Sequence, residues 1–183
     1  AFSARSYLNT KVSRKKAKYH KVLGIAPAYE GNLALAYNQA EVEKVLALEE
    51  GKGIIGEDAQ LASFSEATEY DILHLAMHGF PDTTDPGKSY LQFASDISGR
   101  DRLYAFEIYQ ASIYASLTVL SSCETGYGKL ARGEGVMSLA RAFQAGGSES
   151  VIMSLWLADG KSSEAFWPFF YQSRKENADW IAL

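Results

Sequence analysis

Short apolar runs separated by turn residues are the feature that most constrains how this chain can fold. Five runs have the length of strands and lie at residues 21–27, 52–56, 70–78, 117–120 and 150–156. Segments with helical spacing of apolar residues alternate with them and lie at residues 33–48, 58–68, 103–112, 136–143 and 162–172. Short apolar runs are typical of strands buried on both faces. The alternation therefore predicts an α/β fold, a mostly parallel sheet with helices on both faces.

Two local features qualify this pattern. Residues 79–101 have the composition of a loop, with turn signals at residues 81–87, but residues 90–94 alternate and predict a small hairpin arm. Pro168 lies within the last helical segment. Because proline lacks an N–H and clashes with the preceding turn, we expect it near the helix start or at a kink.

Length and charge limit the domain organisation and the partners. A chain of 183 residues predicts a single domain over residues 1–183. Its first 20 residues form a basic N-terminal segment. Residues 1–21 carry seven basic and no acidic side chains, so the remainder holds 11 basic against 22 acidic residues. The basic run is short and lacks interleaved aromatic rings. We therefore interpret it as a solvated segment and expect no direct binding of nucleic acid.

The remaining composition bears on location. No run approaches 18 apolar residues, so we expect no membrane-spanning helix. One cysteine excludes an internal disulfide and a four-cysteine zinc site, and it favours a reducing, cytoplasmic location. The chain starts without methionine or a signal peptide and ends in mid-pattern, which predicts a fragment of a longer protein.

Two residues with catalytic chemistry follow neighbouring runs. His78 ends the third run, and Cys123, the only cysteine, follows the fourth and precedes a glycine-rich loop. Position alone leaves Cys123 open to two interpretations, a small buried hydrophobe or a reactive thiol. Because parallel strands point the same way, both residues should reach one edge of the sheet, where Gly79 permits close backbone approach. A thiol, an imidazole and backbone amides are the groups that acyl transfer through a thioester requires.

Metal and nucleotide sites are not predicted. His74 and His78 are four residues apart, but Leu75 stands where the zinc motif has glutamate and the stretch is predicted as a strand. We therefore interpret His74 as a hydrogen-bonded core histidine. The glycine loop, residues 126–135, has neither the Walker spacing nor the GxGxxG spacing. We expect no metal and no cofactor.

Two blocks, ILHLAMHGF from residue 72 and LSSCETGYGKLARGEGVMSLARAFQAGGSESVIMSLW from residue 120, resemble the CHAT domain. This family is named for caspase-like proteases associated with tetratricopeptide repeats. The resemblance implies a caspase-like three-layer sandwich, a His78–Cys123 dyad, and an oxyanion hole made by the backbone amides of Gly79 and Cys123. It also implies a protein or peptide substrate and an upstream tetratricopeptide-repeat or other sensor region. Met77 and residues 157–160 depart from the usual family blocks.

The leading functional prediction is a cysteine endopeptidase gated by a fused or bound sensor region. Two alternatives stay open: a caspase-like regulatory domain with weak or no activity, and a different α/β hydrolase or transferase acting on a small thioester or amide. Many relatives in this clan cut after a basic residue and bind it with acidic side chains. Glu124 and Asp159 are candidates for that role. Equally, Glu124 can cap the loop and Asp159 can cap the following helix.

Overall fold

A five-stranded sheet with all neighbours parallel forms the centre of the molecule, in the order β2-β1-β3-β7-β8. The structure is a computed structural model that describes residues 21–121, 134–153 and 160–176. The strands of this sheet are β1 (Val22–Pro27), β2 (Gly51–Gly56), β3 (Ile72–Leu75), β7 (Leu117–Leu120) and β8 (Ser150–Met153). The predicted mostly parallel α/β fold is confirmed.

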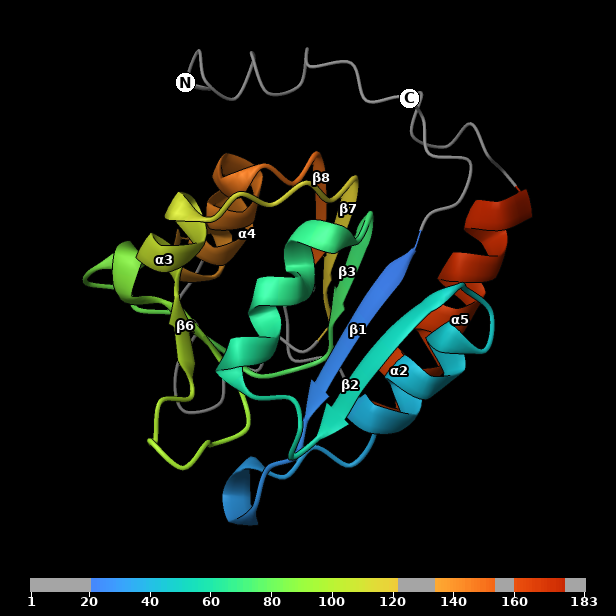
Figure 1. The fold of residues 1–183 in the computed structure, drawn as a ribbon, viewed down its shortest axis with the longest axis horizontal. Helices are drawn as coiled ribbons and strands as arrows, with labels where there is room; N and C mark the ends of the chain where they lie inside the picture. Colours follow the sequence, from blue (N-terminus) through green and yellow to red (C-terminus); the bar gives the residue numbers. More distant parts are fainter. Residues whose placement is uncertain (1–20, 122–133, 154–159, 177–183) are drawn as a thin grey trace.

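Helices cover both faces of this sheet (Figure 1). One face carries α2 (Asn38–Leu46) and α5 (Gly160–Glu176), which contact each other. The other face carries α3 (Ala105–Gln110), α4 (Glu134–Gly146) and a long 3-10 helix, η2 (Leu61–Glu69). The result is the three-layer arrangement predicted for the chain. No helix in the described ranges is long and apolar enough to cross a membrane.

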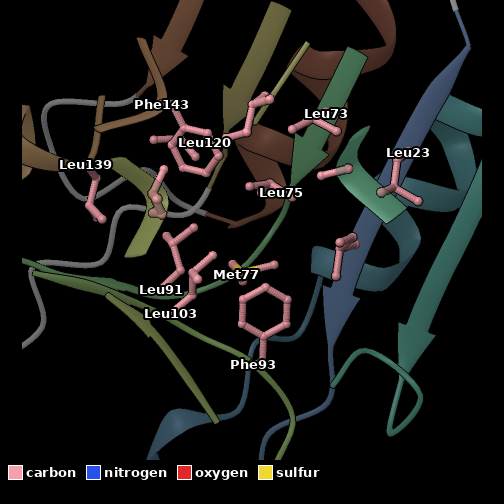
Figure 2. Packing of buried hydrophobic residues seen from close by; sticks show 14 of the residues in the cluster. Leu23, Leu73, Leu75, Met77, Leu91, Phe93, Leu103, Leu120, Leu139 and Phe143 are labelled. Carbon is pink, nitrogen blue, oxygen red and sulfur yellow. The ribbon is translucent and has the colours of Figure 1, made fainter. Parts of the chain in front are cut away.

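Successive side chains of a strand point to opposite faces of the sheet, so each face has its own hydrophobic packing. The larger core holds Leu23, Leu73, Leu75 and Leu120 against Phe143 of α4 (Figure 2). The smaller core packs the intervening strand residues against α5; its members from strands are Val22, Ile72, Leu117 and Val119, and those from α5 are Trp167 and Tyr171. Burial on both faces explains why β1, β3 and β7 are almost entirely apolar, whereas the edge strand β2 is partly exposed.

Strands β3 and β7 are neighbours, as the order of the runs predicts. Their register pairs Leu75 with Leu120. His78 and Cys123 each follow their paired leucine by three residues. The two chain segments that lead to the predicted dyad therefore leave the same edge of the sheet from matched positions.

A second, antiparallel sheet follows β3 and consists of β4 (Gly79–Phe80), β5 (Tyr90–Gln92) and β6 (Arg102–Tyr104), in that order. A 3-10 turn, η3 (Pro86–Lys88), lies between β4 and β5. The predicted hairpin arm is confirmed as β5. The prediction of loop at residues 79–80 and of helix at residues 103–104 is wrong, because both segments pair with β5.

Several predicted boundaries also move. The helix predicted from residue 33 begins at Asn38, because a 3-10 turn, η1 (Gly31–Leu33), comes first. The Asn38 side chain donates to the carbonyls of Pro27 and Ala76, which ties the start of α2 to the ends of β1 and β3. The third strand ends at Leu75 rather than at His78, since the chain then crosses to the second sheet.

The two other helical predictions differ in type or position. The segment predicted as a helix over residues 58–68 is 3-10 rather than α-helical. Pro168 lies inside α5, well beyond its first turn, which excludes the first of its two predicted positions, near the helix start, and leaves the second, at a kink, a prediction.

Candidate functional site

His78 lies where the chain passes from the parallel sheet to the small antiparallel sheet. Its side chain is fully buried. The imidazole Nε2 lies 2.7 Å from the carbonyl oxygen of Leu33 in η1. A carbonyl oxygen can only accept a hydrogen bond, so Nε2 carries the hydrogen. In the neutral imidazole, Nδ1 is then the nitrogen that accepts a proton.

Tyr29 fixes the backbone of His78. The Tyr29 hydroxyl donates to the Gln92 carbonyl at 2.5 Å and accepts from the His78 N–H at 3.3 Å. Its ring lies 4.7 Å from the imidazole, tilted by 51°. Burial raises the pKa of Tyr29, so the hydroxyl keeps the proton that it donates. The Gln92 N–H donates to the His78 carbonyl at 2.9 Å. The Tyr29 hydroxyl thus lies between the two remaining backbone groups of this pair, the His78 N–H and the Gln92 carbonyl.

The ladder between β4 and β5 sets the direction of the Gly79 amide. In an antiparallel pair, residues alternate between pointing both backbone groups at the partner strand and pointing both away. The His78 carbonyl points at β5, because it accepts from Gln92. Gly79, the next residue, therefore directs its N–H away from β5. An amide that binds a substrate oxyanion must point out of its own ladder in this way.

The other predicted site residues lie outside the described residues. These are Cys123, Glu124 and Asp159, together with the glycine-rich loop apart from its last residues. The described chain reaches Ser121, whose N–H donates to the Leu75 carbonyl at 3.0 Å. The structure therefore places His78, Gly79 and the end of the strand that leads to Cys123, and it leaves the dyad contact itself a prediction.

His74 is a buried structural histidine, as predicted. Its exposed fraction is zero, and its Nε2 lies 2.8 Å from the Glu41 carboxylate. Its Nδ1 lies 3.1 Å from the Tyr171 hydroxyl. Both ring nitrogens thus have partners within the layer formed by α2 and α5. Among the described residues, no three His, Cys, Asp or Glu side chains gather as a metal site would require.

Three groups at this site were not predicted from the sequence: the Tyr29 hydroxyl, the Leu33 carbonyl and the Gln92 backbone. Tyr29 carried a weak signal, since it follows the run at residues 21–27 and so reaches the same edge of the sheet as His78. The other two act through their backbone. A backbone group has no residue type to recognise, so no sequence pattern points to it.

The structure shows an α/β protein with a parallel sheet between two helical layers, in which His78 is buried beyond the end of β3 and β7 lies beside β3; this arrangement agrees with the predicted caspase-like fold. Comparison with known families agrees: the CHAT domain model matches residues 1–180. The chain belongs to the CHAT domain family, which is caspase-like and related to proteases. A search of curated proteins gave no match.

Proposed function

We propose that this chain is a cysteine endopeptidase domain that hydrolyses peptide bonds with a His78–Cys123 dyad. The observation that carries the proposal is the pairing of Leu75 with Leu120 in adjacent parallel strands. Both proposed catalytic residues follow this pair by three residues. The carboxyl edge of a parallel sheet is the usual place for catalysis in α/β folds. Membership of the CHAT domain family supports the same conclusion.

The proposed reaction proceeds through a thioester. His78 Nδ1 takes the proton of the Cys123 thiol, the resulting thiolate attacks the scissile carbonyl, and the Gly79 and Cys123 amides stabilise the oxyanion. His78 Nδ1 gives a proton to the departing amine as the C–N bond breaks. Water then attacks the thioester and gives a proton to Nδ1. The C–S bond breaks, the carboxylic acid leaves, and Nδ1 returns the proton to the Cys123 thiolate. The Leu33 carbonyl holds Nε2–H throughout, so that Nδ1 keeps its position and its role.

The substrate specificity and the control of the domain are further parts of the proposal. Glu124 and Asp159 bind a lysine or arginine side chain before the cleaved bond, unless they serve only as caps. A preference for neutral residues at that position would contradict the first role. A fused or bound sensor region, such as tetratricopeptide repeats, gates access to the site, because a peptidase needs a conformational control against unwanted cleavage.

The direct test is turnover of an internally quenched peptide library by the full-length polypeptide. Cys123→Ala should abolish cleavage, and His78→Ala should lower kcat by about 100-fold or more, the usual range for a general acid–base. His20→Ala, in the basic N-terminal segment, is the matched control and should leave kcat unchanged. Cleavage that survives Cys123→Ala would refute the dyad. Turnover of small thioesters but not of peptides would favour a small-molecule hydrolase.

A further inference from the structure

Aromatic rings form a continuous row across the outer face of the small antiparallel sheet. Phe80, Tyr90 and Tyr104 are directly opposite one another on β4, β5 and β6. The ring centroids of Phe80 and Tyr90 are 5.0 Å apart, and those of Tyr90 and Tyr104 are 5.6 Å apart. Phe106, at the start of α3, stacks on Tyr104 at 5.4 Å. We call these four residues the aromatic row.

The aromatic row begins at the proposed catalytic histidine. The His78 imidazole lies 5.7 Å from the Phe80 ring, measured between centroids. His78 and Phe80 are two residues apart along one strand direction, so they share a face of the sheet. The row therefore leads from the catalytic edge to the solvent without interruption. At its far end the Phe106 side chain is 48% exposed.

The opposite face of the same sheet carries the residues that the fold needs. Leu91 and Leu103 alternate with the ring-bearing residues and point into the larger core, where Figure 2 shows them beside Met77. Phe80, Tyr90 and Tyr104 are only half-buried. Contiguous exposed aromatic surface is uncommon on a folded protein and marks a binding surface. Among the described residues, the Arg102 guanidinium lies over the Tyr90 ring, 4.8 Å from its centroid, and the row is otherwise surplus to the core and available to a ligand.

Nucleic acids and polypeptides can both stack on aromatic rings, and the charges beside the aromatic row distinguish between them as its ligand. Nucleic acid requires unpaired cations beside the rings for its phosphates. Residues 79–107 hold five acidic and three basic side chains. Each of the three basic side chains is paired: Lys88 with Asp85, Arg100 with Glu107, and Arg102 with Asp101. A polypeptide with apolar side chains is thus the fitting occupant.

We propose that the aromatic row binds the part of the protein substrate that lies C-terminal to the cleaved bond, through proline or other apolar side chains. This inference rests on the proposed peptidase function. His78 gives its proton to the departing amine, and that amine begins the C-terminal half of the substrate. The row is at most about 16 Å long, the length of roughly five extended residues. Aromatic-lined surfaces are well suited to proline-rich extended chains.

The test compares two substrates that share a sequence before the cleaved bond. One is an internally quenched peptide with five apolar residues, two of them proline, after that bond; the other has a small aminocoumarin leaving group instead. Phe106→Ala should lower kcat/KM for the long peptide about two- to tenfold, the value of one aromatic contact. The coumarin substrate should be unaffected. Phe169→Ala is the matched control, since Phe169 is also exposed but lies on α5.

The outcomes separate the inference from the function on which it rests. Equal rates of the wild type and Phe106→Ala on the long peptide would refute the aromatic row as a substrate surface. A loss on both substrates, with an unchanged melting temperature, would refute its placement on the leaving side. Failure of the wild type to cleave either substrate or any protein-derived peptide would refute the peptidase function itself. Tight binding of single-stranded oligonucleotide that is lost in Phe106→Ala would also overturn the inference.

Discussion

Tyr29→Phe removes one hydroxyl from the centre of the proposed site and leaves the ring in place. The hydroxyl bridges the Gln92 carbonyl, at 2.5 Å, and the His78 N–H, at 3.3 Å. His78 is fully buried, so its amide loses its hydrogen-bond partner without gaining water. An unsatisfied buried backbone group costs about 1–3 kcal/mol. We therefore expect the free energy of unfolding to fall by about 1–3 kcal/mol.

Urea unfolding followed by fluorescence measures this change. The midpoint should fall while the slope m stays constant, because the surface exposed on unfolding is unchanged. Tyr109→Phe is the matched control, since Tyr109 is exposed and its substitution should stay within about 0.5 kcal/mol. A Tyr29→Phe midpoint equal to that of the control would refute the bridge. The same variant should lower kcat more than it raises KM, because displacement of His78 and Gly79 affects the transition state.

Three further predictions test the layers around the site. His74→Leu leaves the Glu41 carboxylate, now 2.8 Å from the imidazole, buried without its partner, and should lower the free energy of unfolding by about 3–5 kcal/mol; a loss below about 1 kcal/mol would contradict this. Burial raises the pKa of Tyr171, so above about pH 10 the unfolded chain releases a proton that the folded chain keeps, and stability should fall with rising pH by up to about 1.4 kcal/mol per unit. Urea titrations at pH 8 and pH 11 should show a smaller decline in Tyr171→Phe, and an equal decline would refute the assignment. Gly24→Ala places a methyl group 2.5 Å from the Val42 Cγ1 atom and should cost about 1–3 kcal/mol by thermal melting, and a variant as stable as the wild type would show that β1 and α2 have room to adjust.

The sequence predicts the main sheet and the relation between the two strands that lead to His78 and Cys123. Buried parallel strands are continuously apolar, and sequential strands tend to be neighbours, so residues 70–78 and 117–120 could be placed side by side. The structure confirms this at Leu75 and Leu120. His74 was also interpreted correctly, because its place within a strand excluded the helical zinc arrangement.

The small antiparallel sheet and the contacts that hold His78 cannot be predicted from the sequence. β4 has two residues and exists only because it pairs with β5: Gly79 pairs with Leu91, 12 residues further along the chain, and Phe80 pairs with Tyr90, 10 residues further. The helix predicted from residue 33 starts late because the Leu33 carbonyl is held by an imidazole 45 residues further along the chain. Contacts between residues far apart in the sequence can override a local helical pattern of apolar residues, and that pattern gives no sign of them.

The most direct test of the central claim is intact-mass labelling with a peptide acyloxymethyl ketone. This probe forms a thioether with a cysteine that a catalytic histidine and an oxyanion site activate. The wild-type polypeptide, with its activator present, should gain one adduct on Cys123; Cys123→Ala should gain none, and His78→Ala should react at least about 100-fold more slowly. Labelling of Cys123 at the same rate in the wild type and in His78→Ala would contradict the account, because it would show a thiol that reacts without the histidine.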